Sequence, residues 1–549
     1  MKLKKLISLV SAVVICLSLA ACGKAEAGTA ASGNADAAAK AATVSVTLAE
    51  SWEFTSGFYP VITASNSNNY GITYWTRNFY NTLVCYDENG AIQGELAEKW
   101  NISDDGLTYT FTLRDGVKFS DGTPLTAEAV KNSMETAIKN LGVYNGSYGK
   151  LSSIIASMDA PDDKTFVMTL TQPYYGALND LTMCNPLGIV SPAALSGDPY
   201  ANCAAQTAGT GPYQYAGDFD GTAYTFVRNP YYWGDAPALD NFKVKVIEDN
   251  DAKVLALRSG EIDAIIGAQR MSYDAYGELS GNSLFGTAVN SKGSNTRYLG
   301  LNLSKAPFND LKVRQAVSCA LDRDSLCSTV FQGIEQPAET LFEKAKPYCD
   351  VPQATYDFDL DQANALMEEA GWVDTDGDGV REKDGQKLEF TLSYTKSIGS
   401  LDDAALTIAE QLSKIGFKIT PSGTDMMSWF GPIQAGDYAI TIYQTYGGAF
   451  DPTTVVTNMN PDTSTDPVAV QVSSALGGGS ALLTELDSTS DTKKVQEIYT
   501  QLLGTIADQS LVVPVSYTRE FAAWNSGFVS GYDFYPDSMY VVVADIHVQ

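Results

Sequence analysis

The sequence predicts a large mixed α/β protein in which sheets and helices are interleaved over most of its 549 residues. Two periodicities support this prediction. Short segments alternate apolar with polar residues, as strands with one buried face do, and longer segments repeat apolar residues at three- and four-residue intervals, as amphipathic helices do. Because 44% of the residues are hydrophobic, the chain can bury several cores, and two or three domains are expected.

The strand pattern is clearest from Tyr109 to Leu113, where Tyr, Phe and Leu alternate with Thr. Such alternation places the large side chains on one face of a sheet. The same pattern predicts further strands at 165–170, 224–228, 243–247, 388–394 and 438–444.

The helix pattern is clearest after Asp310, which can cap a helix whose apolar residues repeat from Val313 to Leu321. A second helix carries Ala363, Leu366 and Met367 and stops at Gly371, since glycine readily takes the left-handed conformation of a helix end. A third helix is predicted from apolar residues between 495 and 506.

The N-terminus has the features of a lipoprotein signal peptide at residues 1–21. Lysines at positions 2, 4 and 5 precede an apolar run that is too short to cross a bilayer. The run ends at Leu19-Ala20-Ala21-Cys22, which resembles a bacterial lipobox, so Cys22 is the expected lipidation site. Residues 22–42 contain no large apolar side chain and are predicted to form a flexible tether. The remainder is therefore expected outside the cytoplasm, anchored to a membrane by lipid.

Charge and composition exclude several classes of function. The formal net charge of −29 repels phosphate backbones, so nucleic-acid binding is not expected. His547 is the one histidine, and the cysteines at 85, 184, 203, 319, 327 and 349 form no CxxC pair. A zinc site is therefore not predicted, and the sequence does not choose among the 15 pairings that six cysteines allow.

One segment of about 35 residues carries the most specific motif. Between 98 and 133, Asp-Gly pairs at 105, 115 and 121 supply turn residues, and Thr126 can cap a helix that has Glu128 in its first turn. This ordered run resembles the hallmark of the bacterial solute-binding protein family 5, the peptide- and nickel-binding subunits of ABC importers.

Further motifs in the same order extend the resemblance over about residues 45 to 520. They are Gly209–Tyr213, Arg228–Gly234, Ser259–Asp263, Val313–Ala316 with Leu321–Arg323, and Gly371-Trp372 leading into Asp374 to Lys383. The chain is thereby identified as similar to oligopeptide- and dipeptide-binding proteins, with some similarity to the nickel-binding branch.

The resemblance implies a two-lobed, periplasmic-binding-protein-like fold of type II, of the large peptide-binding class. Lobe one is expected to comprise residues 43–265 and the return segment 517–549, with an extra subdomain at about 78–200. Lobe two is expected to comprise residues 266–516.

The implied function is that of a monomeric substrate-binding lipoprotein, at the outer face of the cytoplasmic membrane or in the periplasm. It would capture a peptide or another small polar ligand between closing lobes and deliver it to ABC permease subunits, without a cofactor or a catalytic residue.

Two aromatic stretches are the candidate ligand-binding residues. The first contributes Tyr59, Tyr70, Tyr74 and Trp75, and the second contributes Tyr446, Gly447, Phe450 and Asp451. Tyrosine and tryptophan offer flat apolar faces with a polar tip, and glycine lets a backbone approach a ligand. The alternative is that these aromatic residues pack within their own lobes.

The nickel branch of the family is a second candidate. Its corresponding loop reads Thr-Trp-Gly, an aromatic residue, Asp-Pro and histidine. On that resemblance Tyr446 replaces the tryptophan and Thr453 the histidine. Direct coordination of nickel by the chain is therefore not predicted, whereas binding of a preformed metal chelate stays open.

The acidic segment from Asp374 to Gly379 resembles the start of a calcium loop. Gly385, however, stands at the position where the bidentate glutamate of such a loop belongs, and this favours a solvated acidic turn.

Two other classes of protein compete with the importer subunit. An extracytoplasmic hydrolase would need a nucleophile with a base, paired carboxylates or a metal. His547 lies near the C-terminus and is poorly placed to act as the base, and two SxxK patterns lack the KTG or SDN partners of a serine hydrolase. A peptide-sensing receptor would use the same fold, and the sequence does not separate sensing from import.

Overall fold

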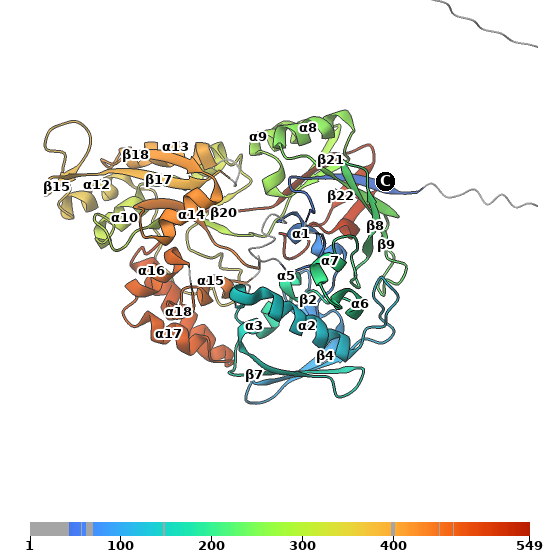
Figure 1. Cartoon of the computed structure of the whole chain (residues 1–549). Coiled ribbons are helices and arrows are strands. Elements are labelled where there is room, and N and C mark those ends of the chain that lie inside the picture. Colours follow the sequence, from blue (N-terminus) through green and yellow to red (C-terminus); the bar gives the residue numbers. More distant parts are fainter. Residues whose placement is uncertain are drawn as a thin grey trace, which may run out of the picture. The chain divides into compact units, whose positions relative to one another are not determined.

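Two large sheets organise the fold of the computed structural model (Figure 1). The structure describes residues 43–55, 57–61, 70–146, 149–396, 401–448, 451–464 and 466–549. The predicted signal peptide, the tether and Cys22 lie outside these described residues. None of the helices in the described ranges is long and apolar enough to cross a membrane.

The first sheet has seven strands in the order β12-β21-β11-β1-β10-β9-β8. Their bounds are β1 Ser45–Glu50, β8 Tyr213–Phe219, β9 Ala223–Arg228, β10 Asn241–Val246, β11 Ala264–Ile266, β12 Phe285–Val289 and β21 Phe521–Asn525. The strand β1 is parallel to both neighbours, while β21 runs antiparallel to β11 and β12. The strand β21, which follows the second lobe in the sequence, thus belongs to the same sheet as β1. We call this sheet with the elements packed on it the first lobe. These elements are α1 Tyr70–Trp75, α8 Asn250–Ser259, α9 Tyr273–Ser280, β22 Val529–Tyr532 and β23 Ile546–Val548.

The second sheet has six strands in the order β14-β20-β13-β19-β17-β18 and forms the second lobe with its helices. Its strands are β13 Thr296–Leu301, β14 Gln336–Pro337, β17 Glu389–Thr395, β18 Lys418–Thr424, β19 Ile440–Gln444 and β20 Val513–Tyr517. Its helices are α10 Leu311–Cys319, α11 Arg323–Thr329, α12 Leu360–Glu369, α13 Leu401–Ser413, α14 Met426–Gln434, α15 Thr453–Thr457, α16 Pro467–Ala475, α17 Gly479–Leu486 and α18 Thr492–Asp508. The short hairpin of β15 Glu382–Lys383 and β16 Gln386–Lys387 follows α12.

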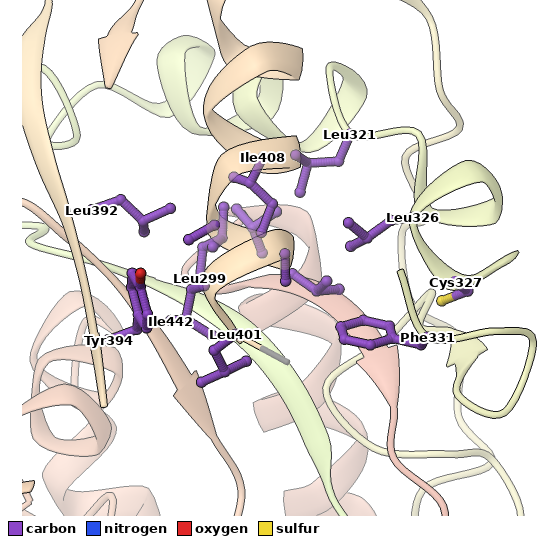
Figure 2. Packing of buried hydrophobic residues seen from close by; sticks show 14 of the residues in the cluster. Leu299, Leu321, Leu326, Cys327, Phe331, Leu392, Tyr394, Leu401, Ile408 and Ile442 are labelled. Carbon is purple, nitrogen blue, oxygen red and sulfur yellow. The ribbon is translucent and has the colours of Figure 1, made fainter. Parts of the chain in front are cut away.

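The core of the second lobe shows why these segments fold as they do. Figure 2 shows Leu401 and Ile408 of α13 beside Leu299, Leu392 and Ile442, which come from three neighbouring strands. All five side chains are buried. The seven-residue spacing on α13 brings both helical residues to one face, so the helix buries an apolar stripe on the sheet.

A four-stranded sheet in the order β4-β5-β7-β6 is inserted between β1 and β8 in the sequence. It comprises β4 Ala97–Ile102, β5 Thr108–Leu113, β6 Ile155–Asp159 and β7 Thr165–Leu170, and it packs against α2 Ala127–Leu141. The Thr126 side chain accepts a hydrogen bond from the Ala129 N–H and so caps α2, as the sequence predicts. Around it lie β2 Val84–Tyr86, β3 Ile92–Gly94, α3 Leu151–Ile154, α4 Ala177–Asp180, α5 Cys184–Leu187, α6 Pro192–Leu195 and α7 Pro199–Asn202.

The strands and helices predicted from periodicity are present within a few residues of their expected bounds. The Asp310 side chain caps α10, and Gly371 follows α12 with a φ of 82°. One boundary differs. The sequence places the passage from lobe one to lobe two at 265/266, but the chain leaves the first sheet only after Val289, because β12 adds to the edge of that sheet beside β21.

Candidate functional site

The two lobes are joined by two crossing segments that are hydrogen-bonded to each other. Residues 290–295 connect β12 to β13, and residues 518–520 connect β20 to β21. The Ser294 N–H donates to the Thr518 carbonyl at 2.9 Å, and the Thr518 N–H donates to the Asn295 carbonyl at 2.8 Å. Segments more than 200 residues apart in the sequence thus form one paired connection, which fixes where the lobes meet.

A cavity of about 220 Å³ lies beside this connection and takes residues from both lobes. Its lining includes Tyr74, Ala268, Gln269, Arg270 and Tyr273 from the first lobe, Arg297, Gln444, Thr445, Tyr446 and Gly447 from the second, and Asn295, Thr518 and Glu520 from the crossing segments, with Met539. The lining is rich in charged and hydrogen-bonding groups, so it suits a polar ligand.

Arg297 is held in the cavity wall by a buried carboxylate. Its Nε and Nη2 donate to Glu335 at 2.8–3.0 Å, and its Nη1 donates to the Gln444 side chain at 3.2 Å. Glu335 is 0% exposed and also accepts the hydroxyl hydrogen bonds of Tyr273 and Ser516. Burial alone would lower the pKa of Arg297, but the Glu335 carboxylate and the Tyr273 hydroxyl together outweigh that effect, and the pKa rises. The guanidinium is therefore a fixed positive charge.

Arg270 is held in the same way from the first lobe. Its Nε and Nη2 donate to Glu50 at 3.1 and 2.5 Å, and Glu50 also accepts the Trp75 indole N–H at 2.7 Å. The guanidinium carbon lies 4.6 Å from the centre of the Tyr74 ring, within the range of a cation–π contact. The arginine, the tyrosine and the buried glutamate thus fix one another at the cavity wall.

The crossing segment 518–520 places Glu520 in the wall of the same cavity as these two arginines. One carboxylate oxygen, Oε2, accepts the Ala268 N–H at 2.7 Å. Burial raises the pKa of Glu520, while the Ala268 hydrogen bond and the charges of Arg270 and Arg297 oppose that rise.

The second aromatic stretch reaches the cavity through Tyr446 and Gly447. The Tyr446 hydroxyl donates to the Asp466 carboxylate at 2.6 Å, and burial together with that carboxylate raises the pKa of Tyr446. Gly447 has a φ of 93°, and a Cβ at this position would lie 2.6 Å from Thr454, so no larger residue fits the turn. Tyr74, which stacks on Trp52 with ring centres 5.8 Å apart, faces the cavity from the first lobe.

The other predicted site residues lie elsewhere. Tyr59 and Trp75 are each 1% exposed in the core of the first lobe, where Tyr59 packs on Tyr200 and Trp75 stacks on Phe242; neither lines this cavity. Asp451 is buried at the start of α15, where its carboxylate accepts the Thr453 N–H at 2.9 Å. Phe450, the Tyr70 side chain and Cys22 lie outside what the structure describes.

Three charged residues of the cavity, Arg270, Arg297 and Glu520, are absent from the sequence-based candidates. Arg297 stands within the apolar strand segment Thr296–Leu301, and a charge in a strand that is otherwise apolar is a signal that could have singled it out. Arg270 and Glu520 carry no comparable local signal, because their placement depends on the crossing segments.

The acidic loop after α12 is the one group in the described ranges with the spacing of a metal site. Carboxylate oxygens of Asp374, Asp376 and Glu382 lie within 4.8 Å of one another. The Lys387 ammonium lies 2.8 Å from Asp376 and 2.5 Å from Asp378, so this lysine already supplies the loop with a positive charge. We assign no metal to it.

A polar cavity between two hydrogen-bonded lobes, with fixed charges from both, is the arrangement of a two-lobed solute-binding protein. Comparison with known proteins agrees with this class. A family model described as "Bacterial extracellular solute-binding proteins, family 5 Middle" matches residues 91–466. The nickel-binding periplasmic protein of Escherichia coli (strain K12) is 30% identical over 439 residues, which cover 80% of this chain and 83% of that protein.

Two further similarities extend over most of the chain. The oligopeptide-binding protein AppA of Bacillus subtilis (strain 168) is 27% identical, with 83% of this chain and 84% of that protein covered. The crystal structure of NikA from Brucella suis in complex with Fe(III)-EDTA matches with a TM-score of 0.84 at 27% identity, covering 92% of this chain and all of that one. The chain therefore belongs to the bacterial extracellular solute-binding proteins of family 5, and the two-lobed fold predicted from the sequence is confirmed. The relatives are named as binding proteins, in agreement with a function in binding and transport rather than catalysis.

Proposed function

We propose that this chain is the extracytoplasmic substrate-binding subunit of an ABC importer and that it captures short peptides between its lobes for delivery to the membrane permease. The observation that carries the proposal is the cavity at the crossing segments, lined by Arg270 of one lobe and Arg297 and Tyr446 of the other. A ligand that contacts both walls favours the closed arrangement over the open one by its difference in affinity for the two.

The chemistry of the cavity favours a small polar ligand over a long apolar one. Its volume of about 220 Å³ lies below the roughly 300–1,000 Å³ of pockets for drug-sized molecules. Backbone groups, two guanidinium groups, a carboxylate and three tyrosines supply donors and acceptors for amide, amine and carboxylate groups. A short peptide carries all three. Relatives of this chain include proteins named for oligopeptide, D,D-dipeptide and glutathione binding.

A metal chelate is the second candidate ligand, and the similarity to nickel-binding relatives favours it. The residues lining the cavity include no histidine or cysteine. A transition metal favours imidazole and thiolate ligands, so a bound metal would have to bring its own chelator, which the arginines and tyrosines would then contact.

We further propose that the protein acts as a monomer held at the outer face of the cytoplasmic membrane or in the periplasm by lipid on Cys22. The basic start, the short apolar run and the small residues before Cys22 support this part of the proposal. Mass spectrometry of the N-terminal fragment from membrane-extracted protein tests it. A diacylglyceryl-modified cysteine is expected, and an unmodified Cys22 in a chain retaining residues 1–21 would overturn it.

Native mass spectrometry of the purified protein, with metal analysis of the same sample, tests the ligand class. A set of bound masses that correspond to short peptides is expected. One stoichiometric metal-containing small molecule would overturn the peptide proposal in favour of the chelate. Turnover of added peptides or glycosides would instead favour a hydrolase, and the absence of permease and ATPase genes beside this gene would favour a sensing receptor.

A further inference from the structure

The crossing segments carry an ion pair on the side that does not face the ligand cavity. Thr518 and Glu520 line the cavity, whereas Arg519, which lies between them in the sequence, does not. The Arg519 Nη2 donates instead to the Glu343 carboxylate at 2.6 Å, and the two side chains are only 10% and 19% exposed. Successive side chains of an extended segment point to opposite sides, so this ion pair lies behind the residues that face the ligand.

Glu343 also contacts the other crossing segment. Its second carboxylate oxygen, Oε2, accepts the Gly293 N–H at 3.1 Å. In the same loop, the Lys346 ammonium donates to the Ser294 carbonyl at 3.0 Å. A single carboxylate therefore holds the middle of both crossing segments, and the neighbouring lysine adds a contact to the first of them.

The loop that carries Glu343 belongs to the second lobe. It follows β14, which pairs with β20 of the second sheet, and its residues Leu341 and Phe342 are buried in a core of that lobe. Glu343 therefore attaches the middle of both crossing segments to the second lobe. Between this attachment and the strands of the first sheet lie only residues 290–292 of one segment and Glu520 of the other.

Gly293 lets the ion pair approach the crossing segment. A Cβ at this position would collide with the Glu343 carboxylate and with the Arg519 guanidinium. The φ of Gly293 lies outside the left-handed region, so the backbone conformation alone does not require glycine. The missing side chain is needed because the carboxylate and the guanidinium occupy the space beside the backbone.

We propose that Glu343 is a positioning residue for ligand capture: it attaches both crossing segments to the second lobe, so that opening and closing pivot on residues 290–292 and Glu520. This inference rests on the proposed function and names the residue that sets the pivot. Glu343 acts through Arg519 and Gly293 and does not itself line the ligand cavity. Without the attachment, the crossing segments could bend along their whole length, and the arrangement in which both cavity walls meet the ligand would be less populated.

Glu343→Gln tests the attachment with little change in volume. The amide oxygen can keep one of the two hydrogen bonds, but the amide nitrogen is itself a donor and cannot accept the other. Glu339→Gln is the matched control, because Glu339 lies in the same loop, is exposed and is 3.8 Å from Lys344. Urea unfolding of both variants establishes that they are folded before binding is measured.

Gly293→Ala is a second variant that leaves every charge in place. It brings one methyl group against the ion pair and should push Glu343 away from the crossing segment. Gly431→Ala is its control, because a Cβ at Gly431 would have no neighbour within 4 Å. If Glu343→Gln does not fold, Gly293→Ala decides the question.

Hydrogen exchange followed by mass spectrometry, with and without alanyl-alanine, tests the inference. In the wild type, the N–H groups of 293–295 and Thr518 should exchange slowly in both states, whereas the ligand should slow exchange at 290–292. Both test variants should speed exchange at 293–295 and Thr518 by about 10-fold or more in the ligand-free protein. Both should also lower the affinity for alanyl-alanine by roughly 5- to 20-fold, within the range of coupling between separate sites.

The two control variants should match the wild type in exchange and in affinity. Test variants that unfold at a lower urea concentration but keep wild-type exchange and affinity would show that Glu343 only stabilises the fold, and would overturn the inference. Ligand-dependent exchange at 293–295 in the wild type would also overturn it, because the pivot would then lie on the other side of the attachment. Failure of the wild type to bind alanyl-alanine would instead overturn the proposed function, while exchange in the ligand-free variants would still test the attachment.

Discussion

The ammonium of Lys150, in the inserted region, lies 3.0 Å from the carboxylate of Asp487, in the second lobe. Lys150 precedes α3 of the inserted region, and Asp487 follows α17 of the second lobe. Beside them, the Gln172 side chain donates to the Asp487 carbonyl at 2.8 Å, and the hydroxyls of Tyr175 and Tyr499 lie 3.0 Å apart. The inserted region packs on the core of the first lobe through Ala137, Leu141 and Cys184, so these contacts hold the two lobes together away from the crossing segments.

Lys150→Met is expected to shift the ligand-free protein toward an open arrangement. It leaves the Asp487 carboxylate, whose residue is 1% exposed, without its cation, and opening lets water reach that carboxylate. Loss of one partner of a buried pair costs about 3 kcal/mol, so the closed form should lose up to roughly 100-fold in population. Small-angle scattering should show a larger radius of gyration, and ligand affinity should fall in proportion.

Lys245→Met is the control for that shift, because Lys245 pairs with Glu261 within the first lobe at 2.9 Å. It should leave both the radius of gyration and the ligand affinity unchanged. The same radius of gyration in Lys150→Met and the wild type would mean that the pair does not hold the lobes closed.

Asp180 should make the stability of the folded protein depend on pH. It is 2% exposed, its carboxylate accepts the Leu151 N–H at 2.8 Å, and burial raises its pKa to about 8. The folded protein therefore holds this proton more tightly than the unfolded chain does. The resulting stabilisation is complete below the unfolded pKa near 4 and is lost as the pH rises through about 8.

Urea unfolding of the wild type and Asp180→Asn between pH 5 and pH 8 measures this contribution. The wild type should lose on the order of 2–4 kcal/mol more than the variant over that interval. Asparagine keeps an acceptor for the Leu151 N–H, so the variant should still fold. Parallel pH profiles for the two proteins would show that Asp180 stays ionised in the folded state. Asp487, whose pKa burial also raises, is common to both proteins and cancels in the comparison.

Local patterns in the sequence predict much of the fold, because they depend on neighbouring residues. Thr126 caps α2 and Asp310 caps α10 by hydrogen bonds that span two or three residues. The apolar stripe of α18 is visible in the spacing of Val495, Ile498 and Leu502 alone. The point at which the chain passes from the first lobe to the second is not predicted by such local patterns. It depends on the pairing of β12 with β21, whose residues lie more than 200 positions away, and no pattern within 285–289 indicates this pairing.

The candidate site is predicted less well for the same reason. Tyr59 and Tyr74 are equally aromatic in the sequence, but one packs in the core and the other faces the cavity, a difference that depends on which side of the lobe each reaches. Glu520 becomes a cavity residue only when residues 518–520 pair with 290–295. Sequence patterns therefore indicated the two aromatic stretches that contain cavity residues, and left out the charges between them.

Glu335→Ala should destabilise the protein strongly because it leaves the buried Arg297 guanidinium without its carboxylate partner. Arg297 is 5% exposed and forms three hydrogen bonds to Glu335. Removing one partner of such a buried pair costs about 3–5 kcal/mol, which chemical denaturation would detect as a lower midpoint at an unchanged slope. The double variant Arg297→Met with Glu335→Ala should recover part of that loss, because no uncompensated charge remains. A single variant within about 1 kcal/mol of the wild type would indicate that water already reaches the pair.

Tyr446→Ala should weaken ligand binding, whereas Tyr59→Phe should not. Tyr446 lines the cavity, so its truncation removes an aromatic wall and leaves Asp466 without the hydroxyl that lies 2.6 Å away. Loss of such an aromatic contact is expected to lower affinity for a short peptide by roughly 10-fold or more. Tyr59→Phe removes only a hydroxyl that accepts a hydrogen bond from Asn140 at 3.3 Å in the core of the first lobe. Titration of both variants with alanyl-alanine compares the two aromatic residues. Equal losses of affinity would mean that the ligand extends beyond this cavity or that Tyr59 supports the cavity indirectly. An unchanged affinity in Tyr446→Ala would remove Tyr446 from the site.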